Sequence, residues 1–253
     1  MQYGIYTSAA GALAMESRLD VVANNLANAD TPGFRRGYAV FQQRLTEALE
    51  PPLYEPQRNA VLDELGGGLF VHEVAFDERS EGLNPTSNTF DVALQGDGWF
   101  AVRHDGEELY TRAGNFIRNQ DGRLVTADGE SDVLDVEGNP IDIPGVGGVV
   151  IDENGVIHVN DEPVAQLARV GSVDYRAFRP TGENLYRHVG QGELEPATGR
   201  VRQGFLEHST VNSVREMVEM IRTFRAYESN QRMITQQDES FGRAVNDIGR
   251  SSS

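Results

Sequence analysis

The sequence predicts an α+β protein in which long N- and C-terminal helices pair as a coiled-coil-like assembly domain, with an antiparallel β-rich domain inserted between them. Three observations lead to this fold class. Apolar residues recur at seven-residue intervals near both ends of the chain. Short apolar runs separated by turn-forming pairs fill the middle. Negative charge is concentrated in that middle region, since residues 51–203 carry 12 arginines against 27 acidic residues.

The first helix is predicted over residues 4–28, a stretch without proline. Pro32 disfavours helical geometry in the residue before it, and Gly33 permits a turn, so the helix is expected to end ahead of this pair. A narrow apolar stripe, typical of a coiled-coil seam, repeats every seven residues at Ile5, Ala12, Leu19 and Leu26.

The last helix is predicted to begin at Ser213, because Ser213 and Glu216 match the capping-box pattern. It runs for about 35 residues, or roughly 50 Å at 1.5 Å per residue, and ends at Gly249. A helix this long with so narrow an apolar stripe needs a partner helix to be stable. The alternative is that the segment is a core helix of an ordinary helical bundle. The seam consists of Met220, Tyr227, Ile234, Phe241 and Ile248, accompanied by Met217, Phe224 and Val245.

Between the ends, turn pairs such as Asp97-Gly98, Asp105-Gly106 and Asp121-Gly122 separate short apolar runs. This pattern predicts antiparallel hairpins. The strongest strand candidates are residues 90–94, 99–102 and 149–151.

The predicted elements divide the chain into three regions. Residues 1–34 together with 205–253 form the helical assembly domain, residues 35–75 an extended linker, and residues 76–204 the β-rich domain. The linker is predicted to be extended because prolines and a glycine run between residues 51 and 68 interrupt any regular element.

Composition excludes several classes of protein. The net charge of −17 argues against nucleic-acid binding, because the phosphate backbone repels a chain of that sign. No stretch approaches the roughly 18 apolar residues of a membrane span, so we expect no direct membrane insertion. The first residues lack the basic and apolar regions of a secretory signal, so we expect no cleaved signal peptide. The absence of cysteine removes disulfides and thiol catalysis.

The sequence predicts no catalytic, cofactor-binding or metal site, and we expect no enzyme. The 5 histidines are scattered singly, without the spacing of metal ligands. The Asp-Gly pairs lack the alternating oxygen ligands of a calcium loop. The glycines at 66–68 and 96–98 are not followed by a phosphate-binding helix, and no serine lies in a nucleophile elbow.

Four strings, in order along the chain, resemble the landmarks of the bacterial flagellar rod and hook protein family. Residues 19–34 resemble the N-terminal signature, with the motif residues Asn24, Asn25, Leu26, Asn28, Thr31, Gly33 and Phe34. Residues 88–100 resemble the central landmark, which includes Asp91, Gly96, Gly98, Trp99 and Phe100. Residues 110–126 resemble the third landmark and residues 211–228 the closing helix. The chain length is similar to that of FlgF/FlgG-type rod proteins.

The resemblance implies a structural subunit of the flagellar basal-body rod. Such a subunit is exported unfolded by the flagellar type III apparatus and polymerises through its terminal helices into the axle that transmits motor torque to the hook. The implied partners are copies of itself, other rod subunits, hook subunits, basal-body ring proteins and the export apparatus. The implied location is the periplasmic rod. The alternative is a hook subunit, or another axial filament or surface adhesin subunit with the same helical ends.

We expect subunit contacts along the two apolar seams. An asparagine within a seam would satisfy its amide by cross-helix hydrogen bonds and fix the register of the helices. For Asn24 and Asn25, exposure to solvent near the helix end is the alternative, whereas Asn28 is predicted to cap the helix. The residues predicted to make subunit contacts are Ile5, Leu19, Leu26, Met217, Met220, Phe224, Tyr227, Ile234 and Phe241.

Overall fold

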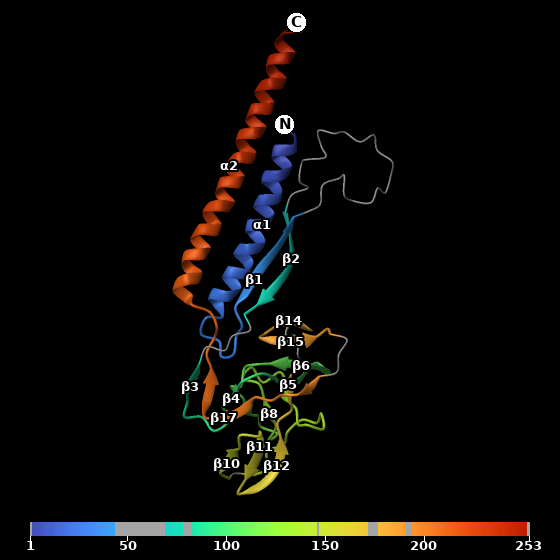
Figure 1. Cartoon of the computed structure of the whole chain (residues 1–253), viewed down its shortest axis with the longest axis vertical. Helices are drawn as coiled ribbons and strands as arrows, with labels where there is room; N and C mark the ends of the chain where they lie inside the picture. Colours follow the sequence, from blue (N-terminus) through green and yellow to red (C-terminus); the bar gives the residue numbers. More distant parts are fainter. Residues whose placement is uncertain are drawn as a thin grey trace, which may run out of the picture. The chain divides into compact units, whose positions relative to one another are not determined.

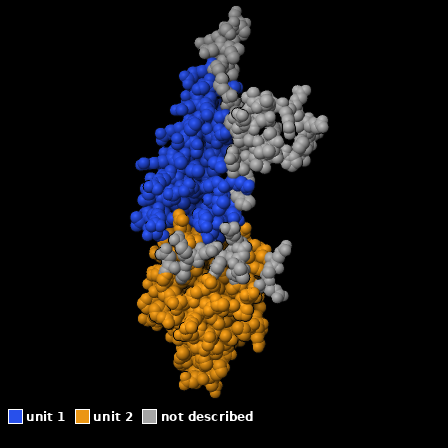
Figure 2. All heavy atoms as spheres, in the orientation of Figure 1, with its two compact units in different colours: residues 1–27, 37–76, 212–253 blue, residues 28–36, 77–211 orange. Residues whose placement is uncertain are grey.

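The computed structural model describes residues 2–43, 69–77, 82–145, 147–171, 177–190 and 194–251. It contains two compact units, which are coloured separately in Figure 2. The predicted α+β class is confirmed, with a helix at each end of the chain and antiparallel strands in the middle. Unit 1 comprises Met1–Ala27, Gly37–Phe76 and Asn212–Ser253, and unit 2 comprises Asn28–Arg36 and Asp77–Val211.

Unit 1 is built on two antiparallel helices that lie side by side (Figure 1). Helix α1 (Gln2–Ala27) has 26 residues and α2 (Ser213–Ser251) has 39, so α2 extends past the start of α1. Both helices occupy the regions predicted from the seven-residue repeats. Among the described residues, no helix has the length and apolar character that crossing a membrane requires.

The first turn of α2 is capped by the residue that precedes it. The side-chain Oδ1 of Asn212 accepts a hydrogen bond from the backbone N–H of Arg215 at 3.0 Å. The backbone carbonyl of Asn212 accepts the N–H of Glu216 at 2.9 Å. The helix therefore begins at Ser213 as predicted, with Asn212 as a capping residue that the sequence pattern did not single out.

Unit 1 also contains a two-stranded antiparallel ribbon, β1 (Gly37–Gln43) and β2 (Leu69–Phe76), which contacts α1 (Figure 1). The register shifts between Val40 and Phe41. Apart from Phe76, both strands lie in residues 35–75, the segment that we predicted as an extended linker. The described residues there form a paired ribbon, which the prediction did not include. The prolines and glycines behind that prediction fall at residues 44–68, outside the described residues, and leave both strands uninterrupted.

Unit 2 is dominated by a nine-stranded antiparallel sheet with the order β14-β15-β6-β5-β9-β8-β7, in which β13 pairs with β5 and β16. Strand β5 lies near its middle, between β6 and β9. The strands of this sheet are β5 (Trp99–His104), β6 (Glu107–Thr111), β7 (Ile117–Arg118), β8 (Leu124–Val125), β9 (Asp132–Val133), β13 (Arg169–Gly171), β14 (Phe178–Gly182), β15 (Leu185–His188) and β16 (Glu195–Pro196).

Three smaller sheets complete the described part of unit 2. One has three strands, β10 (Val149–Ile151), β11 (Val156–Val159) and β12 (Glu162–Gln166). The other two are pairs, β3 (Leu83–Pro85) with β18 (Phe205–Glu207), and β4 (Val92–Gln95) with β17 (Arg200–Gln203). Strands β4, β5 and β10 confirm the three strand candidates from the sequence.

Local turn chemistry sets the register of the central hairpin. His104 of β5 pairs with Glu107 of β6, so Asp105 and Gly106 form a two-residue loop. Their φ angles are 50° and 82°. Positive φ at both positions is the geometry of a type I′ turn, which aspartate followed by glycine adopts readily.

Apolar side chains from several of these sheets meet in one core. Val92, Leu94, Phe100, Leu124 and Ile157 are fully buried there. Strands from residue 92 to residue 201 contribute to this core, so unit 2 forms only when distant parts of the chain come together.

Gly114→Ala is expected to destabilise unit 2. A Cβ at this position would lie 1.7 Å from the carbonyl oxygen of Val92, and the Gly114 carbonyl accepts the Val92 N–H at 2.9 Å. The backbone would have to move, which we expect to lower the free energy of unfolding by at least about 2 kcal/mol, measured by urea denaturation. Gly148→Ala is the control, because a Cβ there meets no atom within 4 Å. Equal stability of the two variants would contradict this packing.

Candidate assembly site

Two glycines of α1 face amide side chains of α2 at close range. A Cβ placed on Gly4 would lie 3.0 Å from the side-chain amide of Gln237, and one placed on Gly11 would lie 3.2 Å from the amide of Asn230. The pairs lie seven residues apart on both helices. Each glycine therefore receives an amide side chain of α2 in the space where a side chain of α1 would otherwise stand.

The same spacing continues to Asn25 near the end of α1, two seven-residue repeats beyond Gly11, and Asn25 is 1% exposed. Its Nδ2 donates to the Gly37 carbonyl at 2.8 Å and to Oε2 of Glu216 at 3.2 Å. Its Oδ1 accepts the Gly37 N–H at 2.8 Å. Asn25 thus makes a cross-helix hydrogen bond and also fixes the start of β1, whereas Asn24 is exposed.

Further polar side chains lie along the contact between α1 and α2. Arg18 of α1 forms an ion pair with Glu219 of α2. Ser8 on α1 and Thr223 on α2 are buried, as is the apolar Val22. The contact between the two helices of one chain therefore consists largely of small and polar groups.

The residues predicted for subunit contacts differ in how far they are buried within unit 1. Met220, Tyr227 and Ile234 of α2 are partly buried, as are Ile5, Leu19 and Leu26 of α1. Three others are largely exposed: Met217, Phe224 and Phe241.

An apolar surface that the sequence analysis did not single out lies on α2. We call it the outer face; its large apolar side chains are exposed by 44% or more and comprise Val214, Met217, Val218, Ile221 and Phe224. Spacings of three and four residues place them on one side of the helix. This spacing was the signal that could have found Val214, Val218 and Ile221, which lie outside the seven-residue rows. On α1, Tyr6 and Leu13 are also exposed, seven residues apart.

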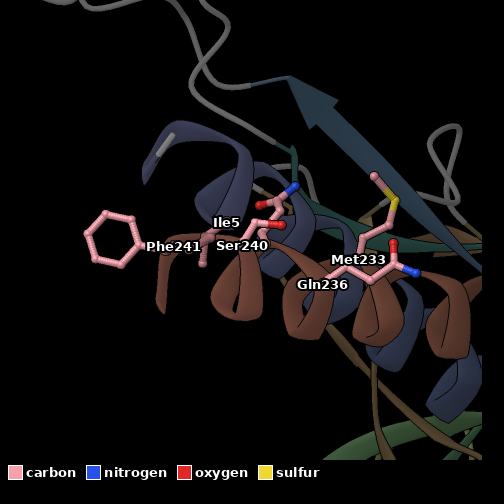
Figure 3. Close-up of a pocket in the computed structure, with 6 residues that line it drawn as sticks. Ile5, Met233, Gln236, Ser240 and Phe241 are labelled. Atoms are coloured by element: carbon pink, nitrogen blue, oxygen red, sulfur yellow. The ribbon is translucent and has the colours of Figure 1, made fainter. Parts of the chain in front are cut away.

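A groove of about 280 Å³ lies where α2 runs alongside the start of α1. Figure 3 shows Met233, Gln236 and Ser240 along α2, with Ile5 from α1 beside them. Its lining combines apolar and amide side chains, and Phe241 completes it. The groove therefore joins two of the predicted contact residues, Ile5 and Phe241.

The end of the N-terminal motif is built into unit 2. Thr31 Oγ1 donates to Oδ1 of Asn28 at 3.1 Å, and its N–H donates to the Asn28 carbonyl at 3.2 Å, so these residues close the turn after α1. The N–H of Gly33 donates to the Glu207 carbonyl at 2.9 Å. With φ of +67°, and only 2.4 Å between its hypothetical Cβ and a backbone carbonyl group, position 33 requires glycine. Phe34, the residue after Gly33, is buried.

A buried ion network holds this segment. Glu207 is 2% exposed, and its Oε1 lies 2.9 Å from Nη2 of Arg35, while its Oε2 lies 3.4 Å from Nη1 of Arg112. Arg112 also donates from Nη2 to the Gly96 carbonyl at 2.8 Å. Its guanidinium carbon lies 5.8 Å from the centre of the Trp99 ring. One carboxylate therefore joins Arg35, the residue after the first family-like string, to Arg112 of the third string, and Arg112 in turn contacts the second string. No local sequence pattern indicates this connection.

The central landmark belongs to the core of unit 2. The Asp91 carboxylate accepts a hydrogen bond from Nδ2 of Asn88 at 2.8 Å. The Trp99 ring centre lies 4.6 Å from that of Tyr186, and Phe100 is fully buried. Burial raises the pKa of the Tyr186 phenol to about 12, so the ring against Trp99 stays neutral at physiological pH. A Cβ on Gly98 would lie 2.4 Å from the Cβ of Ala197. These contacts give the landmark a packing role.

One group of side chains in the described residues has the spacing of metal ligands. Potential ligand atoms of His104, Glu130 and Glu183 lie within 4.8 Å of one another. Both carboxylates are exposed, and Nδ1 of the histidine lies 3.0 Å from the Ser131 hydroxyl. Exposed acidic groups of this kind are common on protein surfaces, so this arrangement defines no metal centre.

A helix at each end of the chain, antiparallel strands between them in the sequence, and the four strings in order are together the features of an axial flagellar protein. Three family models match the chain in the corresponding order. The model described as "Flagella basal body rod protein" matches residues 5–35, the "Flagellar hook protein FlgE/F/G D1 domain" matches residues 93–159, and the "Flagellar basal body rod FlgEFG protein C-terminal" matches residues 202–247.

Similar proteins extend over the whole chain. The flagellar basal-body rod protein FlgF of Mesorhizobium japonicum is 32% identical, with 100% of both chains covered. The FlgF protein of Caulobacter vibrioides is 33% identical over 99% of each chain. The FlgG protein of Agrobacterium fabrum is 33% identical, covering 92% of this chain and 94% of its own length. The chain therefore belongs to the flagellar basal-body rod proteins of the FlgF/FlgG type. It is a structural subunit of the rod in the flagellar basal body.

Glu207→Ala is expected to destabilise unit 2 by about 3–5 kcal/mol, because it leaves the guanidinium groups of Arg35 and Arg112 buried without their carboxylate. Urea denaturation of the purified chain measures the change. Glu153→Ala is the matched control, since Glu153 and its partner Arg200 are 59% and 73% exposed, and an exposed ion pair contributes about 0–1 kcal/mol. Similar losses in both variants would mean that the buried network does not hold the segment.

Proposed function

We propose that this rod subunit polymerises through the apolar surfaces that its terminal helices expose. The observation that carries the proposal is the outer face of α2, where Ile221 is 56% and Phe224 51% exposed. Contiguous apolar surface of this kind marks a protein–protein contact. Helices of neighbouring subunits that offer similar stripes would bury it.

The outer face offers apolar burial that the separate chain does not use. Burying a large apolar side chain contributes about 1.5–3 kcal/mol when it starts fully exposed, so half-exposed side chains contribute about half as much each. The contact between α1 and α2 buries mainly small and polar groups. Assembly therefore adds the apolar contacts that the separate chain lacks.

The predicted seam residues are proposed to act in two ways. Met217, Phe224 and Phe241 would contact neighbouring subunits directly, since they are exposed. Ile5, Leu19, Leu26, Met220, Tyr227 and Ile234 are partly buried in unit 1, and we propose that they complete coiled-coil-like packing when other helices surround the pair. In this proposal the terminal helices of unit 1, which lie within segments 1–34 and 205–253, are the assembly domain.

Unit 2 is proposed to lie outside the helical axle. Most of the net negative charge falls in residues 51–203, and solvent or the basal-body ring proteins would face it. Other rod subunits and hook subunits would contact the helices and transmit torque along the axle.

Export of the unfolded chain by the flagellar type III apparatus, without a cleaved signal peptide, completes the proposal. Relatives named as rod proteins favour it over the hook or adhesin alternative.

Phe224→Glu is expected to abolish swimming in cells that make only this variant, because a carboxylate on the outer face cannot be buried between helices without a partner. Electron microscopy of isolated basal bodies should show rods that stop before completion. Ser229→Glu places the same charge at an exposed polar position of α2 and should leave both swimming and rod length unchanged. Basal bodies of normal length in the Phe224→Glu strain would overturn the proposed contact.

A further inference from the structure

The contact between α1 and α2 repeats at a fixed register over almost the full length of α1. Gly4 faces Gln237, Gly11 faces Asn230, and Asn25 is bonded to Glu216. From Gly4 to Gly11 the pairing advances seven residues along α1 and goes back seven residues along α2. From Gly11 to Asn25 it advances two such steps on α1 and goes back two on α2. The helices therefore follow one antiparallel register without interruption.

The glycines make this register selective. The amides of Gln237 and Asn230 lie 3.0 and 3.2 Å from where a Cβ would stand on Gly4 and Gly11, closer than ordinary contact. An amide of α2 can approach α1 this closely only opposite a residue without a side chain. The two amides and the two glycines are thus matched by shape.

A slide by one heptad breaks the match in either direction. In one direction, Asn230 would meet Arg18, where the long side chain occupies the space, and Glu216 would lose its bond to Asn25. In the other direction, Asn230 would reach Gly4, Gln237 would have no glycine opposite it, and Asn25 would pass beyond the start of α2. Each slide leaves a buried polar group without its partner, which is costly.

We propose that Asn230 and Gln237 specify the register in which α2 pairs with α1, by inserting their amides opposite Gly11 and Gly4. Buried polar residues set register in this way in coiled coils. The apolar residues of α2 are poor register markers, since apolar contact is non-directional and tolerates sliding. The amides specify how α1 and α2 pair within one chain. This pairing is separate from the contact that we propose between subunits.

Crosslinking of engineered cysteines tests this register, because the chain contains no cysteine. Arg18→Cys with Glu219→Cys reports the observed register, since the native side chains meet at their charged ends and a short bis-maleimide of similar length spans the same gap, which is too wide for a direct disulfide. Arg18→Cys with Ala226→Cys reports a slide by one heptad. Treatment of the purified, dilute full-length chain with this crosslinker, followed by denaturing electrophoresis, gives the yield of each intramolecular link, and circular dichroism follows the helix content.

With the amides intact, the first pair should link and the second should not. Adding Asn230→Ala and Gln237→Ala should lower the ratio of the first link to the second by at least about fivefold, because alanine fits opposite any residue of α1 and no longer favours the two glycines. The control adds Ser229→Ala and Gln231→Ala, two exposed polar residues of the same helix, and should leave the ratio unchanged.

Three results would overturn the proposal. The Asn230 and Gln237 variant could keep the ratio of the control, or the slid pair could link readily in the chain with intact amides. Loss of both links together with helix content would show that the amides stabilise the pairing without selecting its register. None of these results bears on the outer face, so they leave the assembly proposal to its own test.

Discussion

The close approach of α1 and α2 is the constraint on which unit 1 depends. Because the helices belong to opposite ends of the chain, their antiparallel pairing brings the two termini of the polypeptide into one domain. Glycine in α1 permits the approach, and amides of α2 fill the space. Using small and polar groups inside the pair leaves the large apolar residues of α2 available on its other side. A single helix can thus serve one partner within its chain and another outside it.

A different kind of interaction holds unit 2. There the apolar core is formed by strands that are distant in sequence, and the segment after α1 is attached to it through the Glu207 carboxylate. Two buried arginines share this carboxylate, and one of them also donates to the backbone beside the central landmark. Burial strengthens these charge-assisted bonds because water does not compete for them. The connecting segment is consequently part of the folded domain.

Periodicity and turn chemistry were sufficient to predict both helices, three strands and the class of fold, because each depends on residues close together in the sequence. The two glycines of α1 that face α2 could not be predicted in this way, because a search for apolar stripes passes over Gly4 and Gly11. Asn25 was a candidate for a cross-helix hydrogen bond only because it belongs to the family motif. The shared carboxylate of Glu207 was equally hidden, since its two arginines lie far away in the chain. Strands β1 and β2 were missed because breakers between them dominated the interpretation of the whole segment.

The glycine at position 11 has a consequence for the order in which the chain can fold. Glycine inside a helix costs about 1 kcal/mol relative to alanine, and an isolated helix of this length is marginal in water even without that loss. Helix α1 therefore depends on α2, which is synthesised more than 180 residues later. Until residues 213–251 have been made, the N-terminal segment has no partner helix. The folding of unit 1 consequently has to wait for the synthesis of α2.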